Sequence, residues 1–217
     1  MTSPAVKICG LTNVRDARVA MDAGADYLGA ILSPGFPRSV SADVAREFAA
    51  LEGPTVVAVV VDLPLVEAAR IATRSDARVI QLHGDESPEY VRALRDHGPW
   101  RLWKAQRVRS TDDLSRALER YGPDVDGLLL EGWHAERGGG TGVGFSWDLI
   151  APVRASIPVD LTLVAAGGLV PGNVHDAVVS LEPDVVDVSS GVELRRGVKD
   201  PDKVRAFVRN ARAGRGS

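Results

Sequence analysis

The sequence predicts an α/β fold, a single (β/α)8 barrel of eight parallel strands over residues 1–213, with a frayed tail at residues 214–217. Eight short apolar segments alternate with eight helical patterns in 217 residues, about 27 residues per unit, which is close to the minimum for a βα repeat. Several segments are apolar on consecutive residues, as expected for parallel strands covered on both faces. An open doubly wound sheet is disfavoured because no G-x-G-x-x-G pattern follows the first strand.

The predicted strands are short apolar runs that each follow a polar or Gly/Pro-rich loop. They are Ala5–Cys9, Tyr27–Leu32, Thr55–Val61, Arg78–Leu82, Arg101–Ala105, Gly127–Leu130, Leu161–Ala166 and Val185–Val188. The predicted helices are amphipathic, and several begin at a polar cap residue or a first-turn proline. They are Asn13–Ala23, Ser41–Leu51, Leu65–Thr73, Ser87–Arg95, Thr111–Tyr121, Ser146–Ala155, Pro171–Leu181 and Pro201–Ala211.

The composition is that of an ordinary globular protein and disfavours several functional classes. A formal net charge of −3 argues against a broad surface for nucleic acid or anionic membranes. The longest apolar run, Val56–Val61, is far shorter than the roughly 20 residues that cross a bilayer. Cys9 is the single cysteine, so no intramolecular disulfide can form, and no metal-ligand spacing is visible. We expect a cytoplasmic protein without a secretory signal, a metal or a nucleic-acid partner.

Polar residues and glycines gather where the predicted strands end. In a (β/α)8 barrel the reactive groups lie at these C-terminal ends. The residues at these ends are Cys9, Asp62, Gln81, His83, Lys104, Glu131, Gly167, Gly168, Ser189, Ser190 and Gly191. The glycines of the last two loops predict a phosphate site, because glycine lets backbone N–H groups approach a phosphate and these loops often bind phosphate in this fold. The alternative is that these glycines only form tight turns.

Cys9, Glu131 and His83 indicate acid–base chemistry at the C-terminal ends of the strands. A lone cysteine is most often an inert core residue, but at a barrel mouth the Cys9 thiolate can act as a base or nucleophile. Lowering its pKa from about 8.5 to about 7 requires roughly 2 kcal/mol. Glu131 ends the sixth strand, whereas Asp126 begins it and is expected to be structural. His83 is expected to hydrogen-bond either a ligand or its own loop.

Short motifs along essentially the whole chain resemble the phosphoribosylanthranilate isomerase family of tryptophan biosynthesis. They are Lys7–Thr12, Ser33–Ser41, Gln81–Gly84, Gly139–Gly142 with Phe145 and Trp147, Ala166–Leu169 with Pro171 and Asn173, and Asp187–Glu193. The resemblance implies a (β/α)8 barrel that needs no cofactor and acts on a small phosphorylated substrate, as a monomer or homodimer. The implied reaction is an Amadori rearrangement of N-(5-phosphoribosyl)anthranilate to 1-(2-carboxyphenylamino)-1-deoxyribulose 5-phosphate.

The resemblance also implies a role for individual residues. Cys9 matches the general base, and Arg38 matches the arginine that pairs with the anthranilate carboxylate. The phosphate is expected on Gly168, Ser190 and Gly191. The family's general acid is an aspartate, and Glu131 stands in its place, with His134 of the following loop as the reserve candidate.

Two alternatives stay open. One is an isomerase of another phosphoribosyl aminoaldose, such as the histidine-pathway intermediate, or an enzyme with dual activity. The histidine-pathway barrel typically uses paired aspartates at the ends of strands 1 and 5. Those positions hold Cys9 and approximately Lys104. The other is a catalytically impaired phosphate-binding paralogue, suggested by the glutamate at position 131.

Overall fold

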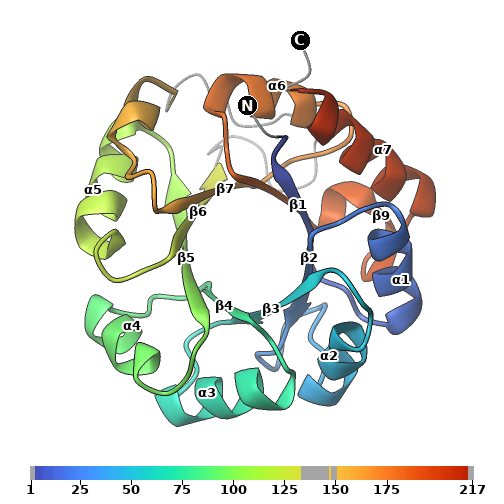
Figure 1. The fold of residues 1–217 in the computed structure, drawn as a ribbon, viewed down its shortest axis with the longest axis horizontal. Coiled ribbons are helices and arrows are strands. Elements are labelled where there is room, and N and C mark those ends of the chain that lie inside the picture. Colours follow the sequence, from blue (N-terminus) through green and yellow to red (C-terminus); the bar gives the residue numbers. More distant parts are fainter. Residues whose placement is uncertain (1–2, 133–146, 148–150, 215–217) are drawn as a thin grey trace.

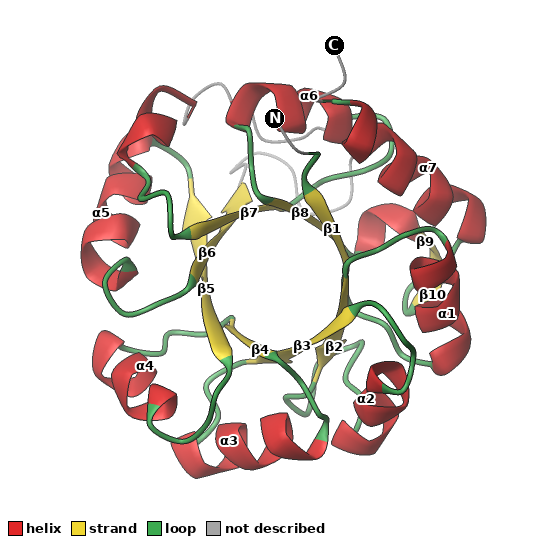
Figure 2. Ribbon diagram, in the orientation of Figure 1, coloured by secondary structure: helices red, strands yellow, loops and turns green. Residues whose placement is uncertain are grey.

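The strands close into a parallel barrel surrounded by the helices (Figures 1 and 2). The structure is a computed structural model that describes residues 3–132, 147 and 151–214. The strands follow one another around the barrel in chain order: β1 (Ala5–Ile8), β2 (Tyr27–Ile31), β3 (Thr55–Val60), β4 (Val79–Leu82), β5 (Arg101–Val108), β6 (Gly127–Gly132), β7 (Thr162–Ala166) and β8 (Val185–Val188). The helices are α1 (Val14–Asp22), α2 (Ala42–Ala49), α3 (Leu65–Arg74), α4 (Pro88–Arg95), α5 (Thr111–Tyr121), α6 (Val174–Leu181) and α7 (Pro201–Ala213). The predicted fold class is confirmed.

The elements between β6 and β7 and after β8 differ from the prediction. Where a helix was expected over Ser146–Ala155, the described part is a 3-10 helix, η2 (Ala151–Ser156). Pro152 would lie in the interior of the expected helix, where its missing N–H and its ring interrupt an α-helix, whereas it lies in the first turn of η2, where proline is tolerated. A 3-10 turn, η3 (Ser190–Val192), follows β8 and leads into two short antiparallel strands, β9 (Glu193–Arg195) and β10 (Val198–Lys199).

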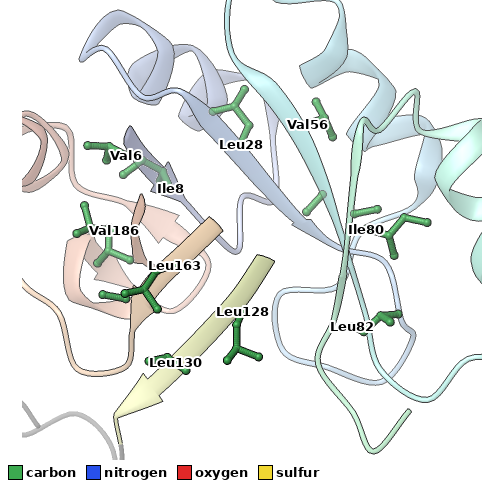
Figure 3. Close-up of a cluster of buried hydrophobic side chains, with 14 of the residues drawn as sticks. Val6, Ile8, Leu28, Val56, Ile80, Leu82, Leu128, Leu130, Leu163 and Val186 are labelled. Atoms are coloured by element: carbon green, nitrogen blue, oxygen red, sulfur yellow. The ribbon is translucent and has the colours of Figure 1, made fainter. Parts of the chain in front are cut away.

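The buried apolar side chains form two layers, one on each side of the strands. One lies between the strands and the helices, and Figure 3 shows part of it, including Ile8, Leu28 and Leu128. The other fills the barrel interior and includes Trp103, Ala105 and Leu129. Successive residues of a strand alternate between these layers.

This alternation corrects the expectation for Lys104. The residue pairs in register with Leu82 and Leu128, which both belong to the outer layer. It is completely buried there, and its Nζ lies 3.1 Å from Glu86 Oε2. Lys104 is therefore on the outer face of β5 and is not part of the barrel mouth.

Aspartates at the entry end of the barrel hold neighbouring strands together. Asp126 Oδ2 accepts a hydrogen bond from the backbone N–H of Leu102 at 2.7 Å. Asp26 and Asp184 make the matching bonds to the N–H groups of Val6 and Leu163. The three bonds tie β2, β6 and β8 each to the strand before it, which confirms the structural role expected for Asp126. In the described ranges no helix is long and apolar enough to cross a membrane.

We predict that Asp126→Ala lowers the free energy of unfolding by about 1–3 kcal/mol, because the Leu102 N–H loses its side-chain acceptor. Urea denaturation measures this change. The matched control is Asp160→Ala, which truncates an exposed aspartate and should change stability by less than about 0.5 kcal/mol. Equal stability of the two variants would contradict the role given to Asp126.

Candidate active site

Polar side chains enter the barrel interior where β1 and β8 meet. Lys7 is completely buried, and its Nζ donates a hydrogen bond to Asp187 Oδ2 at 3.0 Å. Cys9 follows β1 two residues after Lys7, so its side chain points to the same interior, where it packs with apolar side chains of the other strands. Asp187 Oδ1 is buried and has no hydrogen-bond partner among the described residues. This oxygen is a buried acceptor left unpaired by the described residues.

Because Gly29 of β2 has no side chain, the side chains of Lys7 and Cys9 can pack together against its backbone. A methyl group built on Gly29 would be 2.8 Å from Cys9 Sγ and 3.1 Å from Lys7 Cε. Any larger residue there would collide with both side chains. The ammonium-bearing end of the lysine and the thiol therefore lie side by side over this glycine.

Burial and charge act against each other on these groups. Burial raises the pKa of the Cys9 thiol, and the ammonium of Lys7 is the strongest influence that lowers it. Burial also disfavours the charged form of Lys7, but the carboxylate of Asp187 and the Cys9 side chain outweigh it, so the pKa of Lys7 is raised. Lys7 is therefore positively charged at neutral pH.

A second set of polar side chains, from β4, β5 and β6 and the residue after β4, lies at the mouth of the barrel. Gln81 Nε2 lies 2.8 Å from His83 Nδ1, while His83 Nε2 lies 3.9 Å from Glu131 Oε2. Arg107 Nε donates to the same carboxylate oxygen at 3.4 Å. Burial lowers the pKa of His83, although the nearby Glu131 carboxylate opposes this shift. A neutral His83 that accepts from Gln81 carries its proton on Nε2, which faces Glu131.

Arg38 is held by a carboxylate from the segment after β8. Its Nε and Nη2 donate to the two oxygens of Glu193 at 2.6 and 2.7 Å. Lys199 Nζ lies 3.3 Å from Glu193 Oε1 and donates to the Ser189 carbonyl at 3.0 Å. The stem of Arg38 crosses over Gly10, where a Cβ would come within 2.6 Å of Arg38 Cδ. The expected anion-binding arginine thus stands beside Cys9, and none of the described residues is hydrogen-bonded to its Nη1.

The loops after β7 and β8 are in direct contact. Gly167 and Gly168 both have positive φ angles, +88° and +68°, which favour glycine. Asn173 fastens this loop, because its side chain accepts from Val170 N at 2.8 Å and donates to the Gly168 carbonyl at 3.0 Å. A Cβ on Gly191 would overlap the carbonyl oxygen of Leu169. Glycine at position 191 is therefore required for the two loops to pack together.

Most of the residues predicted from the sequence converge on this mouth. Cys9, Gln81, His83, Glu131 and the glycine loops lie in or directly after strands of one barrel, and Arg38 lies in the loop after β2. The contacts described above join Gln81, His83 and Glu131 into one group, and Arg38 to the Ser189 loop through Glu193 and Lys199. The buried charges that surround Cys9 were missed: Lys7, Asp187, Glu193 and Lys199. The period of two along β1, which places Lys7 on the same face as Cys9, is the signal that could have found the first of them. His134 and the motif at residues 139–145 lie outside the described residues.

Comparison with known proteins finds the same enzyme family by sequence and by structure. The family model described as N-(5'phosphoribosyl)anthranilate (PRA) isomerase matches residues 6–210. The N-(5'-phosphoribosyl)anthranilate isomerase of Rubrobacter xylanophilus is 42% identical over 210 residues, which is 96% of this chain and 98% of the relative. The same enzyme of Geotalea daltonii is 40% identical over 214 residues, covering 98% of each.

Two solved structures show the same barrel. The phosphoribosyl anthranilate isomerase of Thermotoga maritima is similar with a TM-score of 0.87 and 34% identity, over 97% of this chain and 99% of that one. A phosphoribosyl anthranilate isomerase in complex with reduced 1-(o-carboxyphenylamino)-1-deoxyribulose 5-phosphate is similar with a TM-score of 0.84 and 33% identity, over the same shares.

Proposed function

Because this chain belongs to the N-(5'-phosphoribosyl)anthranilate isomerase family, we propose that it performs the family's Amadori rearrangement with Cys9 as general base and Glu131 as general acid. N-(5-phosphoribosyl)anthranilate is the substrate, and 1-(2-carboxyphenylamino)-1-deoxyribulose 5-phosphate is the product. One observation supports the roles of Cys9 as base and Glu131 as acid. The thiol beside the buried Lys7 and the carboxyl of Glu131 open into the same barrel mouth, on β1 and β6.

The two groups suit the two proton transfers of this reaction. Glu131 donates a proton to the ribose ring oxygen while the C1–O bond breaks and the anilino nitrogen lone pair forms a Schiff base at C1. The Cys9 thiolate then removes the proton from C2, which gives an enolamine that tautomerises to the ketone. His83 presents its Nε2 side to Glu131 and is proposed to orient that carboxyl.

The substrate's own groups match the remaining side chains. Its phosphate is proposed to bind the backbone of Gly167, Gly168, Ser189, Ser190 and Gly191, and its carboxylate is proposed to pair with Arg38, whose guanidinium suits planar anions. The buried acceptors Gln81 Oε1 and Asp187 Oδ1, which have no partner among the described residues, are proposed to accept hydrogen bonds from the ribose hydroxyls. A buried acceptor left unpaired is costly, so a donor from the substrate fits there.

The interior of the barrel does not favour the histidine-pathway type of isomerase. That chemistry uses aspartates at the ends of strands 1 and 5. Cys9 occupies the first position, the interior residues of β5 near its end are Ala105 and Arg107, and Lys104 faces outward. Neither strand supplies an acid.

The working form is proposed to be a cytoplasmic monomer or homodimer that needs no cofactor. One similar structure is of monomers obtained from a dimeric phosphoribosylanthranilate isomerase of Thermotoga maritima. The experiment that tests the function is turnover of N-(5-phosphoribosyl)anthranilate by the purified protein, together with rescue of a tryptophan auxotroph that lacks this isomerase. Soluble expression without rescue or turnover would favour the impaired paralogue.

Cys9→Ser should reduce kcat by at least about 100-fold and leave substrate affinity within about tenfold. A serine hydroxyl is far harder to ionise near neutral pH than a thiol, so the base is lost while the pocket remains. Steady-state kinetics and inhibitor binding give the two quantities. A serine variant with most of its kcat would remove Cys9 from the base role.

Arg38→Ala should raise KM strongly, because the substrate carboxylate loses its cationic partner. Breaking one side of such a charge pair costs about 2–5 kcal/mol. The matched control is Arg46→Ala, which removes an exposed arginine of α2 and should leave KM unchanged. The same KM in both variants would take Arg38 out of the binding site.

Glu131→Gln should lower kcat at least about 100-fold with little change in ligand binding, because the amide cannot donate the proton that opens the ring. Glu131→Asp should be tolerated, since it keeps the acid and matches the family's residue. His134→Ala is the comparison. If Glu131→Gln keeps the wild-type kcat and His134→Ala loses it, the acid is His134.

A further inference from the structure

We propose that Lys7 is a positioning residue that allows Cys9 to ionise: held in place by Asp187, its ammonium group supplies the positive charge that balances the thiolate. The inference rests on the proposed function in that it takes Cys9 as the base of the reaction. It adds the group that makes a buried thiol usable as a base.

The placement of Lys7 is hard to explain by packing alone. Bulky branched aliphatic residues usually fill the interior of such barrels, and a buried ammonium carries a desolvation penalty of several kcal/mol. Yet Lys7 is completely buried, one of its charged partners is Asp187 at 3.0 Å, and its chain passes Cys9 over Gly29. The nearest atoms to a Cβ placed on Gly29 belong to these two residues.

The charges facing Cys9 do not cancel while the residue is a thiol. The cations that act on Cys9 are Lys7, Arg38 and Lys199. The carboxylates are Asp187, which pairs with Lys7, and Glu193, which pairs with both Arg38 and Lys199. These five groups leave one positive charge in excess, and a Cys9 thiolate brings the cluster to neutrality. An unbalanced charge is costly in a low-dielectric interior, so this excess opposes the effect of burial, which raises the pKa of the thiol.

The groups on the opposite side of the mouth do not change this balance. His83 is uncharged when its pKa is lowered by burial. Glu131 lies 3.4 Å from Arg107, and these two charges offset each other. The excess positive charge therefore belongs to the cluster around Cys9.

The two partners of the ion pair act on Cys9 with opposite signs. The ammonium of Lys7 lowers the pKa of the thiol, whereas the carboxylate of Asp187 raises it. A positioning role through charge therefore makes a prediction that a merely structural role does not. Removing the cation and removing the anion should shift the ionisation of Cys9 in opposite directions.

The experiment measures the rate of Cys9 alkylation by iodoacetamide against pH, on the whole chain without substrate. Cys9 is the only cysteine, so the reaction reports this thiolate alone. Lys7→Met should raise the midpoint of the profile by about 1–3 pH units, the range expected for loss of a neighbouring opposite charge. Asp187→Asn should lower the midpoint. The rising limb of kcat/KM against pH should move with the alkylation midpoint in Lys7→Met.

Lys104→Met is the matched control. Lys104 is equally buried and also paired with a carboxylate, but it lies on the outer face of β5. Its loss should leave the alkylation midpoint unchanged. If Lys7→Met does not fold because Asp187 is left unpaired, the double variant Lys7→Met/Asp187→Asn removes both charges and should still show a raised midpoint, since Lys7 has the larger influence on Cys9.

An unmoved midpoint in the folded Lys7 variant, or shifts of the same sign in Lys7→Met and Asp187→Asn, would overturn the inference. Failure of the proposed function is a separate result. It would appear as no turnover by the wild-type protein, or, for the base role alone, as full turnover by Cys9→Ser, whatever the alkylation profiles of the Lys7 variants.

Discussion

The ion pair between Lys7 and Asp187 lies at the seam where the first and last strands close the barrel, and the mouth is organised around this seam. The two residues are register partners of β1 and β8, and their side chains meet across a separation of 180 positions in the chain. Two residues beyond Lys7, the Cys9 N–H donates a hydrogen bond to the carbonyl of Val188, which follows Asp187, at 2.8 Å. Closure of the seam therefore brings the thiol from the start of the chain against the loop at Ser189.

Charges in the interior of this barrel reflect function more than stability. A buried pair of charges recovers little more than its own desolvation penalty, and apolar residues of similar volume often serve stability equally well. Away from the mouth, apolar side chains such as Trp103 and Leu129 fill the interior of the barrel. The mouth contains charges instead, and those of Lys7, Asp187 and Lys199 act on Cys9, one of the two residues that change protonation state in the proposed reaction.

The short strands β9 and β10 extend this arrangement to the loop after β2. They carry Glu193 and Lys199, which are both almost completely buried. Glu193 holds the guanidinium of Arg38 through two hydrogen bonds, and Lys199 bonds the Ser189 carbonyl at the same time. The proposed contact for the substrate carboxylate is thereby tied to the proposed phosphate loop. A substrate with both anionic groups meets two sites whose relative position is set by one buried network.

The sequence by itself determined the barrel, because the alternation of apolar runs and amphipathic segments is a local property that each element carries alone. It also determined which end of the barrel carries chemistry, and it placed Cys9, His83 and Glu131 there. The sequence did not predict the short elements. The strands β9 and β10 are too short to show a hydrophobic period, and the segment with Pro152 forms a 3-10 helix where an α-helix was expected.

Only the tertiary structure decided which charges face one another. Lys7 and Lys104 both stand in predicted strands, but the register turns Lys7 inward to Asp187 and Lys104 outward to Glu86. Partners of this kind lie far apart in the chain and meet only when the barrel closes. The energy of an ion pair depends on the distance and the dielectric between its charges, and both are set by that closure.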